Sequence, residues 1–304
     1  MNIRLIRCVC DGVFYLTPTC FFGGSGIGRC YSEFPNIEDA GKRDYQPTQQ
    51  ELLEADLRPS VQKTEYYKGE ADKGNPKYCV LYGERLEKGM GTQVDLVNAA
   101  KYYKFAADND YAIAQRFYAR CLQFGIGVPV DLAESTEYYR RSADNGNDIG
   151  QCHYGSCLET GMGVPSDLTL AAEYYKKAAD QDNVFGYIYY GACCERGIGR
   201  SVDLTLAAKY YKKAADQGNK CGQRCYGTCC EHGKGVPVDL PLAAEYYKKA
   251  ADQEDPAGQF HYGKCCEYGR GIPTNYDLAV EYTQTRSNTG FLLRVKTNAT
   301  SMKH

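Results

Sequence analysis

The sequence predicts an all-α protein, an α/α superhelical solenoid of six 36-residue helix-turn-helix repeats plus one lone N-terminal repeat helix. The first observation is that DLTLAAEYYKKAADQ at 167–181 returns as DLTLAAKYYKKAADQ at 203–217 and as DLPLAAEYYKKAADQ at 239–253. The second is that a shorter motif recurs between these copies with the same period, as in YGACCERGIG and YGTCCEHGKG. A constant period of this length is typical of stacked helix pairs. We therefore expect the array over 59–290, an unassigned and partly disordered segment over 1–58, and a C-terminal tail over 291–304.

The first helix of each repeat is expected to end at the GxG triplet, where the first glycine supplies a left-handed C-cap. The cysteines before the triplet are expected in the core. In the column of Cys230, cysteine alternates with leucine, which indicates selection for a compact apolar group. A glutamate recurs one residue later, and we expect it to form a hydrogen bond between adjacent repeats. Its copies are Glu87, Glu159, Glu195, Glu231 and Glu267.

The second helix is expected to begin after an acidic N-cap. An aspartate at the helix start accepts hydrogen bonds from the first backbone N–H groups, which have no partner inside the helix. Ala171, Tyr175, Ala178 and Ala179 then fall on one face of the helix, which predicts a buried stripe. The capping residues are Asp95, Asp131, Asp167, Asp203 and Asp239, with Asn275 in the last repeat.

The combined spacing Ala/Gly-x3-Tyr-Gly-x5-Gly-x-Gly-Val-x2-Asp-x3-Ala-x2-Tyr-Tyr-x2-Ala-Ala resembles the Sel1-like repeat, a relative of the tetratricopeptide repeat. The resemblance implies a scaffold or adaptor for other proteins, in signalling or in protein quality control. A secreted, cysteine-rich branch of that family has been linked to penicillin binding, which leaves a lactam or amide hydrolase as the alternative. The cysteine column that staples the repeats of that branch is occupied here by Ala107, Ala143, Ala179, Ala215 and Ala251, so we do not expect an enzyme.

The variable positions of the first helix are the expected partner-binding site. Residues spaced like Cys225, Thr228 and His232 lie on one narrow stripe, opposite the core-facing side of the helix. In a solenoid this surface lines the concave groove, and aromatic and arginine side chains are typical of interface hot spots. The expected contact residues are Arg116, Phe117, Arg120, Phe124, His153, Ile188, Tyr189, Arg196, Arg224, His232, Phe260, His261, Lys264 and Tyr268.

Metal binding is the alternative use of the cysteine-rich segment. Cys225, Cys229 and His232 are spaced so that three ligands could converge, but a structural zinc site normally has four. The corresponding trios of the neighbouring repeats lack the ligands for a metal of their own. We therefore expect no metal and no cofactor.

The composition of the chain argues against nucleic acid and membrane insertion. Lys and Arg number 36 against 38 Asp and Glu, and a formal net charge of −2 provides no global attraction for nucleic acid. No run approaches the ~18 apolar residues of a membrane span. Basic residues precede a semi-apolar stretch near the N-terminus, but Asp11 interrupts it. We expect a cytoplasmic protein, with secretion as the alternative, that binds a protein or peptide. Self-assembly is a third possibility, and the oligomeric state is not specified by the sequence.

Overall fold

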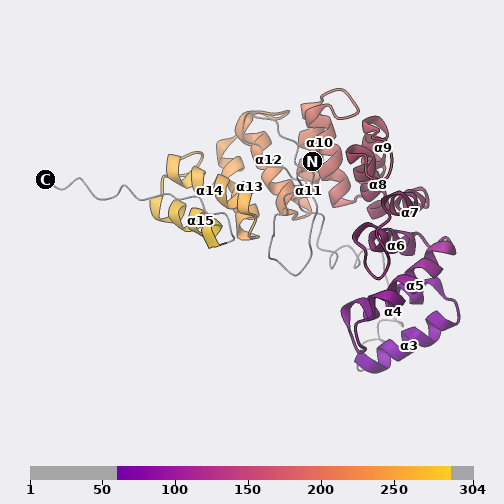
Figure 1. The fold of residues 1–304 in the computed structure, drawn as a ribbon. Helices are drawn as coiled ribbons and strands as arrows, with labels where there is room; N and C mark the ends of the chain where they lie inside the picture. Colours follow the sequence, from indigo (N-terminus) through magenta and orange to yellow (C-terminus); the bar gives the residue numbers. More distant parts are fainter. Residues whose placement is uncertain (1–59, 289–304) are drawn as a thin grey trace, which may run out of the picture.

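The computed structural model describes residues 60–288, and within them every regular element is an α-helix (Figure 1). A lone helix, α3 (Ser60–Asp72), precedes six helix pairs, as predicted. The pairs are α4 (Pro76–Lys88) with α5 (Leu96–Asp108), α6 (Ala112–Phe124) with α7 (Leu132–Asp144), α8 (Asp148–Thr160) with α9 (Leu168–Asp180), α10 (Val184–Arg196) with α11 (Leu204–Asp216), α12 (Lys220–His232) with α13 (Leu240–Asp252), and α14 (Pro256–Tyr268) with α15 (Tyr276–Asn288). The predicted N-terminal segment 1–58 and tail 291–304 lie outside the described residues.

The pairs follow one another in an arc, from α3 at the lower right of Figure 1 to α15 at the left. First helices of neighbouring repeats approach one another directly at α4–α6, α6–α8, α8–α10 and α12–α14. Between 60 and 288, no two second helices approach as closely. The first helices therefore line the inner side of the arc and the second helices its outer side.

The predicted helix caps are confirmed. The Asp167 carboxylate accepts a hydrogen bond from the backbone N–H of Leu170 at 2.9 Å, and Asn275 does the same for Leu278 at 3.0 Å. At the end of the first helix, Gly197 adopts the left-handed conformation with φ 72°, and its N–H binds the carbonyl of Cys193. Because both signals are local, each repeat sets its own helix boundaries.

Replacing Asp167 by alanine is expected to lower the free energy of unfolding by about 1 kcal/mol, because the N–H of Leu170 loses its acceptor. Asp167→Asn keeps a side-chain oxygen at the cap and is expected to cost only a few tenths of a kcal/mol. Urea unfolding followed by circular dichroism measures both changes. Equal losses for the two variants would contradict a capping role.

The second glycine of each triplet has a different function from the first. Gly199 has φ +65°, and a Cβ atom placed on it would lie 1.9 Å from the backbone carbonyl oxygen of Leu168. Leu168 is the first residue of the second helix in the preceding repeat. The same contact recurs at Gly127, Gly163, Gly235 and Gly271. These glycines therefore set the distance between consecutive repeats.

The two adjacent tyrosines of each second helix make different contacts. Tyr174 packs edge-to-face on Tyr154 of its own repeat, with ring centroids 4.8 Å apart, and donates its hydroxyl to Asp144 of the repeat before. Tyr175 packs on Tyr189 of the repeat after, with the ring planes tilted, and donates its hydroxyl to Glu159 of its own repeat at 2.9 Å. One tyrosine pair thus joins three consecutive repeats. The edge-to-face pair recurs at Tyr82–Tyr102, Tyr118–Tyr138, Tyr190–Tyr210, Tyr226–Tyr246 and Tyr262–Tyr282.

The cysteines before the triplets are core residues, as predicted. Cys229 and Cys230 are both buried as free thiols, and so are Cys193, Cys194 and Cys265 in the neighbouring repeats. A buried free cysteine packs as a small apolar side chain. Leu122 and Leu158 are buried in the column of Cys230, which explains the alternation of the two residue types.

Candidate partner-binding surface

The predicted stripe divides into a buried and an exposed part. Five of its members are buried, and for these the prediction of a surface contact is wrong: Arg116, Phe117, Ile188, Tyr189 and Arg224. For Phe117 and Tyr189 the reason is that this side of the first helix packs on the second helix of the preceding repeat. Phe117 stacks on Tyr103, with ring centroids 5.0 Å apart, and Tyr189 packs on Tyr175 with the ring planes tilted.

Two of the three predicted histidines occupy the same kind of position. His153 stacks on Tyr139 and His261 on Tyr247, with ring centroids 4.8 and 4.7 Å apart. Burial lowers the pKa of His153 to about 3, and the nearby charges of Arg116 and Arg120 act in the same direction. Burial also lowers the pKa of His261. His153 is therefore a neutral ring at physiological pH that joins two repeats.

Two predicted arginines are occupied by ion pairs between repeats. The guanidinium of Arg120, on α6, pairs with Glu87 of α4, and both side chains are mostly buried. The Nε atom of Arg224, on α12, lies 3.2 Å from a carboxylate oxygen of Asp255, the N-cap of α14. Because removing one partner of such a pair leaves a buried charge, substitution of either arginine alone is expected to destabilise the array.

The exposed part of the stripe lies at the ends of the first helices. Phe124 is 40% exposed and Tyr268 is 56% exposed, and both Arg196 and His232 are exposed at the equivalent position of other repeats. Phe260 and Lys264 are half-buried on α14. The Lys264 ammonium lies 5.8 Å from the centre of the Phe260 ring and 5.0 Å from that of Tyr268. These six residues are the members of the predicted site that a partner can reach.

A second row of side chains was missed by the sequence reasoning. It consists of the residue between the two glycines of each triplet, and we call it the GxG row: Met90, Ile126, Met162, Ile198, Lys234 and Arg270. Wherever a side chain of this row has a defined hydrogen bond, its partner lies on the first helix of the preceding repeat. Lys234 Nζ lies 2.7 Å from Glu195 Oε1, Arg270 Nη1 lies 2.9 Å from Glu231 Oε1, and Gln123 Nε2 lies 3.2 Å from Met162 Sδ. The signal for this row was present, since only the middle residue varies between two constant glycines.

Three of the recurring glutamates, Glu87, Glu195 and Glu231, form hydrogen bonds between repeats, as predicted. The contacts defined for Glu159 and Glu267 lie within their own repeats. Glu195 accepts from the hydroxyl of Tyr211 at 2.9 Å in its own repeat and from Lys234 in the next. Burial opposes the ionisation of Glu195, but the hydrogen bonds from Lys234 and Tyr211 outweigh it and lower the pKa of this carboxyl. The ionised carboxylate therefore fixes the position of the lysine above it.

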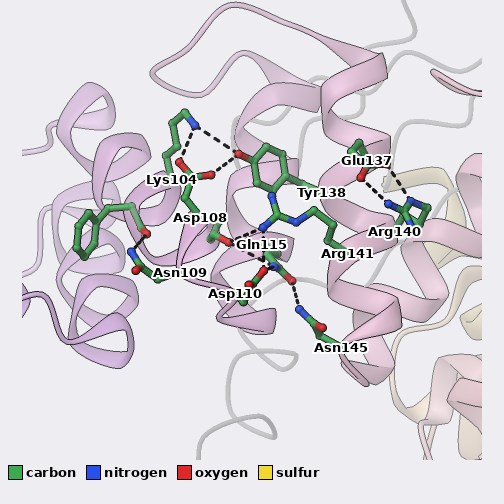
Figure 2. Close-up of polar contacts among 12 residues, drawn as sticks. Lys104, Asp108, Asn109, Asp110, Gln115, Glu137, Tyr138, Arg140, Arg141 and Asn145 are labelled. Carbon is green, nitrogen blue, oxygen red and sulfur yellow. Dashed lines mark hydrogen bonds and ion pairs between the residues drawn. The ribbon is translucent and has the colours of Figure 1, made fainter.

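The outer side of the arc carries a charge-balanced network (Figure 2). Tyr138 of α7 donates its hydroxyl to Asp108 of α5 at 2.5 Å, and Lys104 pairs with the same carboxylate at 2.8 Å. Arg141 of α7 pairs with Asp110 at 2.9 Å. Ion pairs also form along the second helices, as between Lys176 and Asp180 at 2.7 Å. This network holds repeats together on the side away from the exposed part of the stripe.

The cysteines of the segment 224–235 are poor candidates for chemistry. Burial raises the pKa of the Cys229 thiol to about 12, and that of Cys193 likewise. The thiolate is the nucleophile and the metal ligand, so a thiol with a raised pKa is inert at neutral pH. Across residues 60–288, no group of three or more His, Cys, Asp or Glu side chains has an arrangement that could hold a metal ion. None of the described helices is long and apolar enough to span a bilayer.

Comparison with known proteins gives one family. The family model for the Sel1 repeat matches residues 76–111, 112–147, 149–183, 184–219, 223–255 and 256–285. A protective antigen of uropathogenic Escherichia coli with an SLR fold is 28% identical, with a TM-score of 0.69. That alignment covers 75% of this chain and 49% of the antigen, so the chain spans about half the length of that protein. A Sel1 repeat protein from Oxalobacter formigenes is 25% identical over 76% of this chain and 67% of its own, with a TM-score of 0.67. The search of curated proteins finds no match.

Proposed function

Because the chain belongs to the Sel1 repeat family, whose members are generally protein-interaction scaffolds, we propose that it is a non-enzymatic adaptor that binds a protein or peptide on its inner face. One observation carries this proposal. At the ends of the first helices the exposed residue changes from repeat to repeat, through Phe124, Arg196, His232 and Tyr268, while the residues that build the array stay constant. A constant frame with variable exposed side chains is what selective recognition of a partner requires.

The residue types support the same proposal. Aromatic and arginine side chains supply most of the binding free energy of protein interfaces. The position of these exposed side chains also favours partner binding, because the helix ends that carry them are fixed by capping glycines such as Gly197 and Gly233. Side chains that are already positioned lose less conformational entropy when a partner binds.

We propose a cytoplasmic location for this adaptor. The support is chemical: the buried cysteines of the described part of the chain are free thiols, from Cys79 in α4 to Cys266 in α14. Thiols persist in reducing compartments, and disulfides form in oxidising ones.

Affinity capture tests the function. The full chain carrying Phe124→Ala, Arg196→Ala, His232→Ala and Tyr268→Ala is expected to bind its partner at least about tenfold more weakly than the wild type, since these changes remove several hot-spot side chains. The matched control carries Lys101→Ala, Glu173→Ala and Lys209→Ala, at exposed positions of the outer helices.

The captured proteins are identified by mass spectrometry, and the affinity of the principal one is measured with purified components. Circular dichroism checks that all three proteins are folded. A partner that the inner-face variant and the wild type bind equally well, or that only the outer-face control loses, would contradict the proposal.

A further inference from the structure

We propose that the partner segment is an extended peptide with an apolar block and an acidic block, read in register by the GxG row. This inference rests on the proposed function and names the chemistry of its ligand. The six residues of the row occupy one repeated position, but they are of two kinds. The first four are apolar and the last two are cationic, so the surface has a direction along the array.

The apolar half is formed by repeats one to four. Met90 is 37% exposed, and Ile126, Met162 and Ile198 are half-buried against the core with part of their surface accessible. Phe124 adds an exposed aromatic ring two residues before Ile126. Aliphatic and aromatic side chains of a ligand gain about 25 cal/mol for each Å² of apolar surface that they bury there.

The basic half is formed by repeats five and six. The Arg270 side chain is 51% exposed, whereas its partner Glu231 is only 10% exposed. The Lys234 side chain is 27% exposed and its partner Glu195 is 18% exposed, so the contrast is smaller there. The carboxylates therefore lie beneath their cations, and the positive groups face outward.

The neighbouring charges leave this polarity intact. Lys264 pairs with Glu267 at 2.7 Å, and because these two side chains are about equally exposed, they add no net charge. Arg196 is exposed at the end of α10 and adds a positive group at the border with the apolar half. Arg270 and Lys264 both lie near the Tyr268 ring, at 5.6 and 5.0 Å from its centre. A ligand carboxylate would meet cations that are already held in place, which makes charge-assisted hydrogen bonds favourable.

The length of the ligand follows from helix packing. Neighbouring first helices about 10 Å apart give a six-residue row of about 50 Å, which corresponds to about 15 residues of extended chain. A library of random fifteen-residue peptides displayed on phage and selected on the full chain is therefore the appropriate probe. We expect the enriched peptides to carry Asp and Glu at one end and Leu, Ile, Phe or Met at the other.

Two variants of the full chain test the direction of the surface. Lys234→Met with Arg270→Ile gives repeats five and six the residue types that repeats one to four carry at the same position, so the fold is retained and circular dichroism verifies it. We expect this variant to enrich peptides without the acidic block. The matched control, Lys176→Met with Lys212→Ile, removes two lysines from outer-face ion pairs and is expected to enrich the wild-type sequences.

A fluorescently labelled peptide from the wild-type selection is used to measure how much the two variants change the affinity. Its dissociation constant, measured by anisotropy, is expected to rise at least about tenfold with Lys234→Met and Arg270→Ile, to change less than about twofold with the control, and to rise with salt. Enriched peptides without acidic residues, or equal affinities for both variants, would overturn the inference and leave the proposed function standing. If no peptide is enriched and the inner-face variant also captures its partner normally, both fail. A dimer seen by light scattering that prevents peptide enrichment would also overturn the inference, because a second copy of the chain would then occupy the surface.

Discussion

Gly199→Ala is expected to destabilise the array by about 3 to 5 kcal/mol, the largest effect of any single-methyl addition that we foresee. Two costs add. The residue has φ +65°, a conformation that disfavours a Cβ atom, and the new atom would lie 1.9 Å from the carbonyl oxygen of Leu168. The oxygen belongs to the backbone of a helix in the preceding repeat, so relief requires the two repeats to move apart.

The chain contains its own control for this prediction. Gly218 has φ +81° and has nothing within 4 Å of the position that a Cβ atom would take. Gly218→Ala therefore carries only the conformational cost, about 1 kcal/mol. Urea unfolding of both variants, followed by far-ultraviolet circular dichroism, measures the difference. If the two substitutions cost the same, contact between Gly199 and the preceding repeat does not determine the stability of the array.

Replacing Tyr175 by alanine is expected to lower the free energy of unfolding by about 3 to 5 kcal/mol, because it leaves a cavity between two repeats. The side chain is fully buried, and its ring packs on Tyr189 of the next repeat. Tyr175→Phe keeps the ring and removes only the hydrogen bond to Glu159, and we expect a loss of about 1 to 2 kcal/mol.

Tyr268→Ala is the matched exposed substitution. Its ring is largely in solvent, so the stability is expected to change by no more than about 0.5 kcal/mol. Thermal and urea unfolding of the three variants checks this order. A Tyr268→Ala variant as unstable as Tyr175→Ala would mean that the exposed ring supports the fold, and its loss could not be interpreted as a binding effect.

The features that the sequence predicts correctly are those set within one helix or one turn. Asp167 caps its helix and Gly197 ends another because both act on backbone groups a few residues away. The burial of Cys230 follows from the same logic, since its column holds only cysteine or leucine in the six repeats. Repetition strengthens these signals, because each prediction is made independently in several copies.

The errors concern contacts between repeats. A helical wheel places Phe117 and Tyr189 opposite the core of their own repeat, and they are indeed there. The wheel of one helix does not contain the angle at which the next repeat packs, and that angle closes the space around both rings. The sequence likewise places Gly199 only in the triplet that ends a helix, although its closest neighbour belongs to another repeat. The GxG row was not predicted for the same reason, because the contact of Lys234 is with Glu195 of the preceding repeat.

The tyrosine links between second helices have a mechanical consequence. Tyr102 to Asp72, Tyr138 to Asp108 and Tyr174 to Asp144 each connect only two consecutive repeats. Such hydroxyl–carboxylate links act as joints, and a rotation of a few degrees at each joint accumulates along the chain. Small adjustments distributed over the whole arc would shift its two ends over a large distance without breaking any single contact. If a segment binds on the inner face as proposed, we expect the curvature of that face to adapt to its shape.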